Sequence, residues 1–298
     1  MSEAALREAA AAVRSEASAR YPVLVDTTVW SMLDGRPMVG GAVLVGAQAD
    51  AYQKALTRFS PDDRAVVRPV VLTSLETSWH KQRWARLEDG VVDLHRNPDV
   101  DDLQTQWTGP SGLRWFAEDP AGGPRNLVQL PDGTVGWVDG EGLSASEPES
   151  DPWEAIRRAV PGEAVGPGSL ETAARVARRR LGRPYLWGGN TEAASDCSGF
   201  VQSVAWEAAS VLLPKHTKDQ LRRGARVAAG AVAPGDFVYV KGRDRSVMHV
   251  GLALPDAHGV GVIHSCLSRG RVLEESKEDF LQRYRFVGAR RIVLWGTA

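Results

Sequence analysis

A proline-rich break near the middle of the chain separates two sequence patterns, and it constrains the fold more than any other feature. Residues 146–168 contain four prolines and a cluster of serine and glutamate, a composition typical of a linker. Before the break, short apolar runs alternate with Gly and Pro turns. After it, two helical patterns precede a series of alternating strands. Helices followed by antiparallel strands predict an α+β fold for residues 169–298.

The strand patterns before the break predict a small β-rich module. Leu127–Leu130 and Thr134–Val138 flank a Pro-Asp-Gly turn, which is a hairpin signal because glycine accepts a positive φ. We therefore expect a small β-barrel over residues 91–145. Residues 1–20 are rich in Ala, Glu and Arg and predict a polar N-terminal helix.

Composition and charge exclude several classes of protein. Hydrophobic residues make up 43% of the chain and charged residues 24%, which is ordinary for a globular protein. The net charge of -1 gives no bulk attraction for nucleic acid. No window approaches the roughly 20 apolar residues of a membrane span, and the N-terminus lacks the apolar core of a signal peptide. We therefore expect no nucleic-acid or membrane partner and a cytoplasmic location.

The two cysteines of the chain, Cys197 and Cys266, are too few for a disulfide framework or a four-cysteine zinc site. Cys197 follows a glycine-rich loop and opens an apolar-periodic stretch that ends near Ser210, so its sulfur is expected at a helix N-terminus. The helix dipole and unpaired N–H groups stabilise a thiolate there. The sequence favours a reactive Cys197 over a cysteine that only packs in the core.

Two histidines in strand patterns supply a base and an orienting group. In the strand pattern Met248–Leu254, alternation puts Val250 on a core face. His249 falls on the other face beside the small Gly251, which leaves room for the helix of the nucleophile. His264 lies on the next strand, within reach of His249. A cysteine, a histidine and a polar orienting group form the arrangement of cysteine hydrolases, and no metal-ligand spacing occurs, so we expect neither a metal nor a cofactor.

The chain from about residue 170 to 294 resembles the NlpC-type cell-wall cysteine peptidases. The segments that carry the resemblance occur in the family's order and are Gly182–Gly189 (GRPYLWGG), Asp196–Phe200 (DCSGF), Leu213-Pro214, Thr217–Gln220, Pro234–Val238 (PGDFV), His249–Gly251 (HVG) and Ile263-His264. In one departure, Ala208-Ala209-Ser210 replaces the glycine that usually ends the helix of the nucleophile, which removes a favoured C-cap.

The resemblance implies a papain-like fold and a catalytic set. Cys197 would be the nucleophile, His249 the general base and His264 the orienting third member. We expect residues 169–298 to form this cysteine peptidase domain.

The same resemblance implies four substrate-binding residues. Tyr185 would lie near the oxyanion site and Trp187 would line the cleft. Asp196 and Ser198 would help to bind the free amine of the substrate, although Asp196 is equally well explained as a helix N-cap.

The N-terminal half carries fainter similarities. Residues 91–145 resemble a bacterial SH3-like domain. The zone from Val25 to Pro37, with Thr28 and Trp30, shows a faint likeness to the N-terminal SH3-like lobe of dipeptidyl-peptidase VI enzymes, which are γ-D-glutamyl-L-diamino-acid endopeptidases; residues 38–90 do not share it. We expect residues 21–90 to form a degenerate SH3-like lobe.

These resemblances predict a cysteine endopeptidase that cleaves between D-glutamate and the diamino acid of murein peptides such as L-Ala-γ-D-Glu-diamino acid. With a cytoplasmic location, its role would be peptidoglycan recycling. The alternatives are an exported hydrolase of intact peptidoglycan, an inactive SH3-like peptide-binding module, and an acyltransferase on the same scaffold. Cys266 would share a strand face with His264, so we hypothesise that oxidation couples it to Cys197, with buried packing as the alternative.

Overall fold

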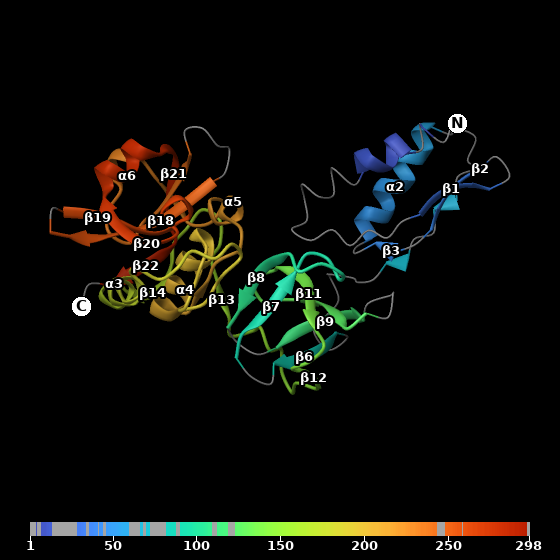
Figure 1. Ribbon diagram of the computed structural model, residues 1–298, viewed down its shortest axis with the longest axis horizontal. Coiled ribbons are helices and arrows are strands. Elements are labelled where there is room, and N and C mark those ends of the chain that lie inside the picture. Colours follow the sequence, from blue (N-terminus) through green and yellow to red (C-terminus); the bar gives the residue numbers. More distant parts are fainter. Residues whose placement is uncertain are drawn as a thin grey trace.

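The fold is described from a computed structural model (Figure 1). The residues it describes are 4, 7–13, 29–33, 36–40, 42–43, 46–59, 66–67, 70–71, 82–87, 90–108, 112–118, 123–242, 248–257 and 259–296. Helices and sheets both occur in these ranges, as the α+β expectation requires. None of the described helices is long and apolar enough to cross a membrane.

The N-terminal segment contains short strands and one longer helix. Residues 7–13 are helical, within the helix expected over residues 1–20. Much of the lobe expected over residues 21–90 lies outside the described residues. Val13, Val39 and Tyr52 pack together in a small buried cluster. The elements are β1 (Val29–Leu33), β2 (Arg36–Gly40), β3 (Ala42–Val43), α2 (Gly46–Phe59), β4 (Val66–Val67) and β5 (Val70–Val71).

The middle segment forms a seven-stranded antiparallel sheet, which we call the β module. The expected hairpin is confirmed, because Leu127 pairs with Trp137 across the turn. The strand order is β12-β6-β9-β10-β11-β7-β8, so β12 and β8 are the edges. The small β-barrel expected over residues 91–145 is not confirmed, because no closed barrel is found within the described ranges and the sheet already begins at Arg83. Its strands are β6 (Arg83–Leu87), β7 (Val92–His95), β8 (Leu103–Trp107), β9 (Leu113–Glu118), β10 (Arg125–Gln129), β11 (Val135–Asp139) and β12 (Leu143–Ser146).

The proline-rich segment packs on its neighbours. Trp153 is buried and donates from Nε1 to the carbonyl oxygen of Gly112 at 2.7 Å. The sequence from Trp153 to Val160 is compatible with a short helix, but the chain forms a turn there and then β13 (Arg157–Arg158), which pairs with β15 (Val211–Leu212). Pairing with a distant strand therefore outweighs the local helical preference.

The C-terminal segment begins with two helices and continues into a six-stranded antiparallel sheet of order β16-β21-β17-β18-β19-β20. The strand expected over Met248–Leu254 is present, and His264 lies on the next strand along the chain, as expected. The remaining elements are β14 (Val165–Ser169), α3 (Leu170–Arg179), α4 (Cys197–Ala209), α5 (Thr217–Gln220), β16 (Ala225–Val227), η2 (Ala229–Ala231), β17 (Phe237–Lys241), β18 (Met248–Asp256), β19 (Gly259–Cys266), η3 (Leu267–Arg269), β20 (Arg271–Ser276), α6 (Lys277–Arg283), β21 (Arg285–Arg291) and β22 (Val293–Gly296).

Different helices cover the two faces of this sheet. Helix α4 packs on the face that carries Val250 and Leu252. Ala253, on the opposite face, packs with Phe280 of α6. The expectation that the helix of the nucleophile approaches the face of His249 is therefore wrong. Alternation along a strand distinguishes its two faces, but it does not say which helix covers each.

Candidate active site

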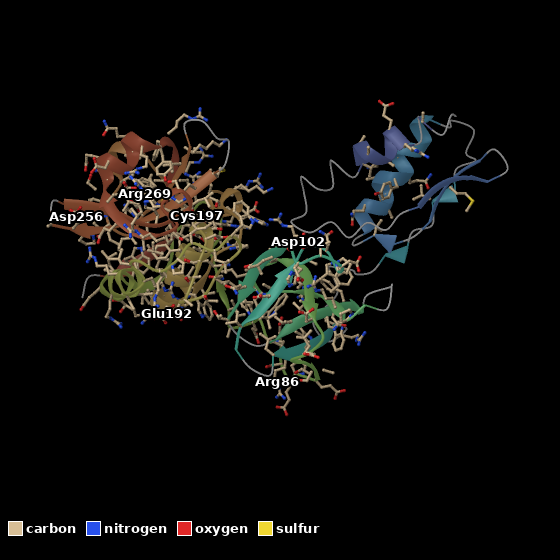
Figure 2. The ribbon with its side chains drawn as sticks, viewed as in Figure 1. Arg86, Asp102, Glu192, Cys197, Asp256 and Arg269 are labelled. Atoms are coloured by element: carbon tan, nitrogen blue, oxygen red, sulfur yellow. The ribbon has the colours of Figure 1, made fainter. Side chains whose placement is uncertain are left out.

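Cys197 is the first residue of α4, as the sequence predicted, and lies inside the C-terminal lobe (Figure 2). Asp196 is the N-cap, and its Oδ1 accepts from the backbone N–H of Gly199 at 2.6 Å. A Cβ on Gly199 would lie 2.1 Å from the carbonyl oxygen of Gly189. The close approach of the preceding loop to the helix therefore requires glycine at this position.

The thiol of Cys197 is protonated in the resting site. Only 8% of the residue is exposed. Burial and the neighbouring Asp196 carboxylate raise the pKa of this thiol to about 12, although the N–H of Val250, the Lys215 ammonium and the Thr217 hydroxyl oppose the shift. The expectation that the helix N-terminus favours a thiolate is not met, because desolvation outweighs the helix dipole. A general base must therefore take the proton.

The structure brings the two predicted histidines together. His249 on β18 and His264 on β19 place Nε2 and Nδ1 2.7 Å apart, with their rings at 77° to each other. Burial and the proximity of His264 hold the pKa of His249 well below its usual range. His249 is consequently neutral at neutral pH and can accept a proton.

The thiol reaches the sheet beside His249. Its sulfur interacts with the backbone N–H of Val250, the residue that follows His249. Within the described residues, the thiol and the His249 ring are not hydrogen-bonded to each other. Because His264 occupies Nε2 of His249, Nδ1 is the nitrogen left for the thiol. Such contacts are often loose in a free enzyme and tighten when substrate binds.

Asp196 is already fully engaged. Oδ1 accepts from Gly199 and from the Ser198 hydroxyl, at 2.6 and 2.8 Å. Oδ2 accepts from the Gly188 N–H at 3.1 Å and from Lys215 Nζ at 2.7 Å. A carboxylate offers about four acceptor positions, so none is left for a substrate amine in this arrangement. The N-cap interpretation of Asp196 is confirmed, and its predicted binding of an amine, together with Ser198, would require these partners to be displaced.

Tyr185 lies near the thiol and Trp187 lies on the surface. Burial, followed by the negative charges that Cys197, Asp196 and Cys266 can carry, raises the pKa of Tyr185, which places its hydroxyl within electrostatic range of these groups. Trp187 is 53% exposed. Their roles at the oxyanion site and in the cleft stay predictions.

Two charged residues of the site were missed by the sequence analysis. Lys215 is buried and paired with Asp196. Glu275 of β20 accepts from His264 Nε2 at 2.8 Å. Lys215 could have been found from its position in the sequence, directly after the Leu213-Pro214 segment that carries part of the family resemblance. Glu275 gave no comparable signal, because its contact depends on how two strands pair.

Cys266 is buried close to the histidines. Its sulfur lies 3.3 Å from Ser268 Oγ and 3.6 Å from the Tyr284 hydroxyl. The ring of Tyr284 lies 5.2 Å from that of His249. Both cysteines are free thiols, and their coupling on oxidation stays a prediction. Among the described residues, no group of three or more His, Cys, Asp and Glu side chains is arranged to hold a metal ion.

Comparisons with known proteins agree with the sequence resemblance. The profile of the NlpC/P60 family matches residues 182–291. Over 112 residues the chain is 35% identical to the probable endopeptidase NlpC of Escherichia coli (strain K12). This matched region covers 37% of this chain and 70% of the E. coli protein.

Two further comparisons show how much of each protein is shared. The chain is 35% identical over 88 residues to the gamma-D-glutamyl-L-lysine dipeptidyl-peptidase of Bacillus subtilis (strain 168), over 28% of this chain and 29% of that enzyme. The chain thus spans less than a third of the length of the Bacillus enzyme. The structure of NlpC1 from Trichomonas vaginalis superimposes with a TM-score of 0.43 and 16% identity, over 74% of this chain and 96% of that one.

Proposed function

The chain belongs to the NlpC/P60 family, and from that premise we propose that it is a cysteine peptidase that hydrolyses the bond between γ-D-glutamate and the diamino acid of murein peptides. The observation that carries this proposal is the hydrogen bond between His249 and His264, together with the contact of the Cys197 sulfur with the N–H of Val250, the residue after His249. A nucleophile, a base and an orienting group are the components that acyl transfer requires.

The proposed reaction begins with a neutral thiol and a neutral imidazole. Cys197 Sγ attacks the amide carbonyl carbon while His249 Nδ1 takes the thiol proton. The resulting imidazolium gives that proton to the departing amine, which leaves a thioester on Cys197. His249 then takes a proton from water as the water attacks the thioester, and Cys197 is released as a thiol.

The start of α4 supplies the donors for the oxyanion. Asp196 already accepts from the N–H groups of Gly199 and Phe200, through its side chain and its carbonyl oxygen. The N–H groups of Cys197 and Ser198 come earlier in the same turn and point the same way along the helix axis. We assign them to the developing oxyanion, where a fixed donor is worth about 10²–10³ in rate.

The proposal also includes free peptides as the substrates, in place of intact peptidoglycan, and a role in peptidoglycan recycling. Free peptides of the type L-Ala-γ-D-Glu-diamino acid are the proposed substrates, and the cytoplasmic location predicted from the sequence stays part of the proposal. The proposal does not include a strict need for a free amine on the substrate, because all acceptor positions of Asp196 are engaged.

The experiment compares three substrates and three enzymes. The substrates are L-Ala-γ-D-Glu-diaminopimelate, its N-acetylated form and polymeric peptidoglycan, and the products are identified by mass spectrometry. Wild type and Cys266→Ala, the matched cysteine control, should release diaminopimelate from the free peptide. Cys197→Ala should lower the rate by at least about 10⁴-fold.

The outcomes separate the alternatives. Cleavage at another bond would contradict the proposed specificity. Greater activity on polymeric peptidoglycan than on the free peptide would favour the exported hydrolase, and no hydrolysis of any of the three would favour the inactive binding module.

A further inference from the structure

A chain of hydrogen bonds leads from the proposed base to the surface of the C-terminal lobe. His249 Nε2 lies 2.7 Å from His264 Nδ1, and His264 Nε2 lies 2.8 Å from Glu275 Oε1. The other carboxylate oxygen, Oε2, accepts from Arg283 of α6 at 2.8 Å. The four side chains come from three adjacent strands and the helix that packs on them, so the fold fixes their order.

The carboxylate of Glu275, towards the end of this series of hydrogen bonds, is ionised. Burial alone would raise the pKa of Glu275, but the hydrogen bond from His264 and the charged guanidinium of Arg283 outweigh it and hold the pKa below its ordinary value. The Glu275 side chain is 10% exposed and His264 is fully buried. An ionised carboxylate only accepts hydrogen bonds, so each group that touches it must donate.

This requirement determines which ring nitrogens carry protons. His264 must be protonated at Nε2 to donate to Glu275. In a neutral His264, Nδ1 is then an acceptor, and His249 must be protonated at Nε2 to donate to it. Neutral His249 is left with its lone pair on Nδ1, the nitrogen that the proposed reaction uses to take the thiol proton.

We propose that Glu275, held in place by Arg283, is a positioning residue that sets the tautomers of both histidines so that His249 presents an unprotonated Nδ1 to Cys197. The proposal rests on the proposed function for the role of His249 as the base. Glu275 acts only through His264 and touches no reacting atom. A carboxylate has this orienting effect on a catalytic histidine in serine proteases, where replacing it with an amide gives the wrong tautomer.

Arg283 makes the substitution Glu275→Gln informative. An amide has one accepting oxygen and one donating nitrogen. Arg283 can only donate hydrogen bonds, so it should donate to the amide oxygen, which turns the amide nitrogen towards His264. His264 Nε2 must then accept, its proton moves to Nδ1, and His249 becomes protonated on Nδ1. The number of protons is unchanged, but the lone pair of His249 no longer faces the thiol.

Other groups pack against this network and must be considered in its pH dependence. Tyr284 lies beside both histidine rings, and its pKa is raised by burial and by its hydrogen bond with Cys266. Phe280 covers the remaining side of His264 without a charge. The raised pKa keeps Tyr284 neutral near neutral pH. Cys266, which is 1% exposed, lies against its hydroxyl. Glu275 and Arg283 are therefore the charges that act on the pair.

The test uses the full chain with three changes: Glu275→Gln, Arg283→Met, and both together. Four quantities are measured. They are kcat and KM on L-Ala-γ-D-Glu-diaminopimelate, the rate at which iodoacetamide alkylates Cys197 (followed by peptide mass spectrometry), and the nitrogen NMR shifts of ¹⁵N-labelled histidine rings, which distinguish protonated from unprotonated nitrogens.

Glu275→Gln should lower kcat by about 10²-fold, with KM changed less than about twofold. It should also slow alkylation of Cys197 and exchange the protonated nitrogens of His249 and His264. Arg283→Met should change kcat by less than about threefold, because the carboxylate remains. The double variant should recover at least about tenfold over Glu275→Gln, since the amide oxygen is then free to accept from His264.

Rescue by a second substitution separates a tautomer effect from a merely structural one. Wild-type tautomers and alkylation rates in Glu275→Gln would overturn the proposal, and so would a double variant as slow as the single one. Thermal unfolding of each variant shows that it is folded. If the wild type hydrolyses no murein peptide, the proposed function fails. The NMR shifts and the alkylation rates still decide this proposal.

Discussion

The β module and the C-terminal lobe are both built on antiparallel sheets, but their ion pairs differ in how far the charged partners are exposed to solvent. In the β module, Arg125 is buried, yet its partners Asp101 and Asp139 are exposed. In the C-terminal lobe, both members of the Lys215–Asp196 pair are buried. The first arrangement removes one charge from water and leaves its partners exposed. The second is costly and needs complete hydrogen bonding.

Aromatic rings pack in the core that the β module shares with the proline-rich segment. Trp84 and Trp153 pack edge to face with their centroids 5.2 Å apart. The guanidinium of Arg114 lies over the ring of Trp153 at 4.2 Å. The β module is therefore stabilised by apolar area and cation–π contacts, whereas the C-terminal lobe keeps ionisable groups where chemistry is proposed. Substitutions in the two regions should have different consequences.

The largest effect on stability is expected from Trp153→Ala. The change opens a cavity, breaks the bond to Gly112 and removes the contacts with Trp84 and Arg114, which together should cost about 4 kcal/mol of unfolding free energy. Urea unfolding measures this loss. Trp153→Phe keeps a ring and should lose much less. Trp153 shares its core with Leu212 of the C-terminal region, so a change in kcat of more than about threefold in the folded variant would show that the cavity disturbs the proposed catalytic site.

Lys215→Met should have the next largest effect. It leaves the Asp196 carboxylate buried without its cation, which should lower the unfolding free energy by about 3 kcal/mol. The remaining donors, Gly188, Ser198 and Gly199, limit the loss.

The control for this change removes the charge on both sides. Asp196→Asn combined with Lys215→Met should recover at least half of the lost stability, because no unpaired charge remains. Equal stability of Lys215→Met and wild type in urea unfolding would mean that the buried pair contributes nothing. The contrast with the β module would then lose its main support.

The pH dependence of activity should follow the burial of His249. The base must be neutral to accept a proton, and burial together with His264 lowers its pKa well below 6.5. The acid limb of kcat/KM should therefore have its midpoint below pH 6.5. At pH 5.5 an unshifted imidazole would keep only about a tenth of its neutral form, so the expected advantage there is up to about tenfold.

Measurements of kcat/KM between pH 5 and 8 at constant ionic strength test this expectation. Circular dichroism at each pH serves as the control for unfolding. The same lowered pKa makes the fold less stable as the pH falls below 6.5, since the unfolded chain binds the proton more tightly. An acid limb at or above pH 6.5 would contradict the assignment of a buried, neutral base.

Local patterns predicted the elements of the site well. Asp196 before an apolar-periodic stretch predicted the helix start at Cys197, and alternation predicted the strands of His249 and His264. These features depend on neighbours within one or two turns or along one strand. Sequence reasoning can therefore reach them from a single chain.

Long-range features of the same site were beyond that reasoning. The contact between Glu275 and His264 depends on how β19 and β20 pair and on where α6 packs. The thiol pKa was expected to fall because a helix dipole is local, but it rises because burial of Cys197 is a property of the whole lobe. Partner choice and desolvation are set by tertiary packing, and this is what the sequence pattern does not contain.

The smallest effect concerns Ser210, which follows the helix of the nucleophile in a left-handed conformation with φ of 52°. In the sequence, Ser210 lies near the place where the family usually has a glycine. Left-handed backbone strains a residue with a Cβ, so Ser210→Gly should raise the unfolding free energy by about 0.5–1 kcal/mol, partly offset by the larger entropy of glycine in the unfolded chain. Ser210→Ala, which keeps the Cβ, is the matched control and should not raise the unfolding free energy.

Because Ser210 lies at the far end of α4 from Cys197, kcat should stay unchanged. An increase in the unfolding free energy of Ser210→Ala equal to that of Ser210→Gly would refute backbone strain as the cause.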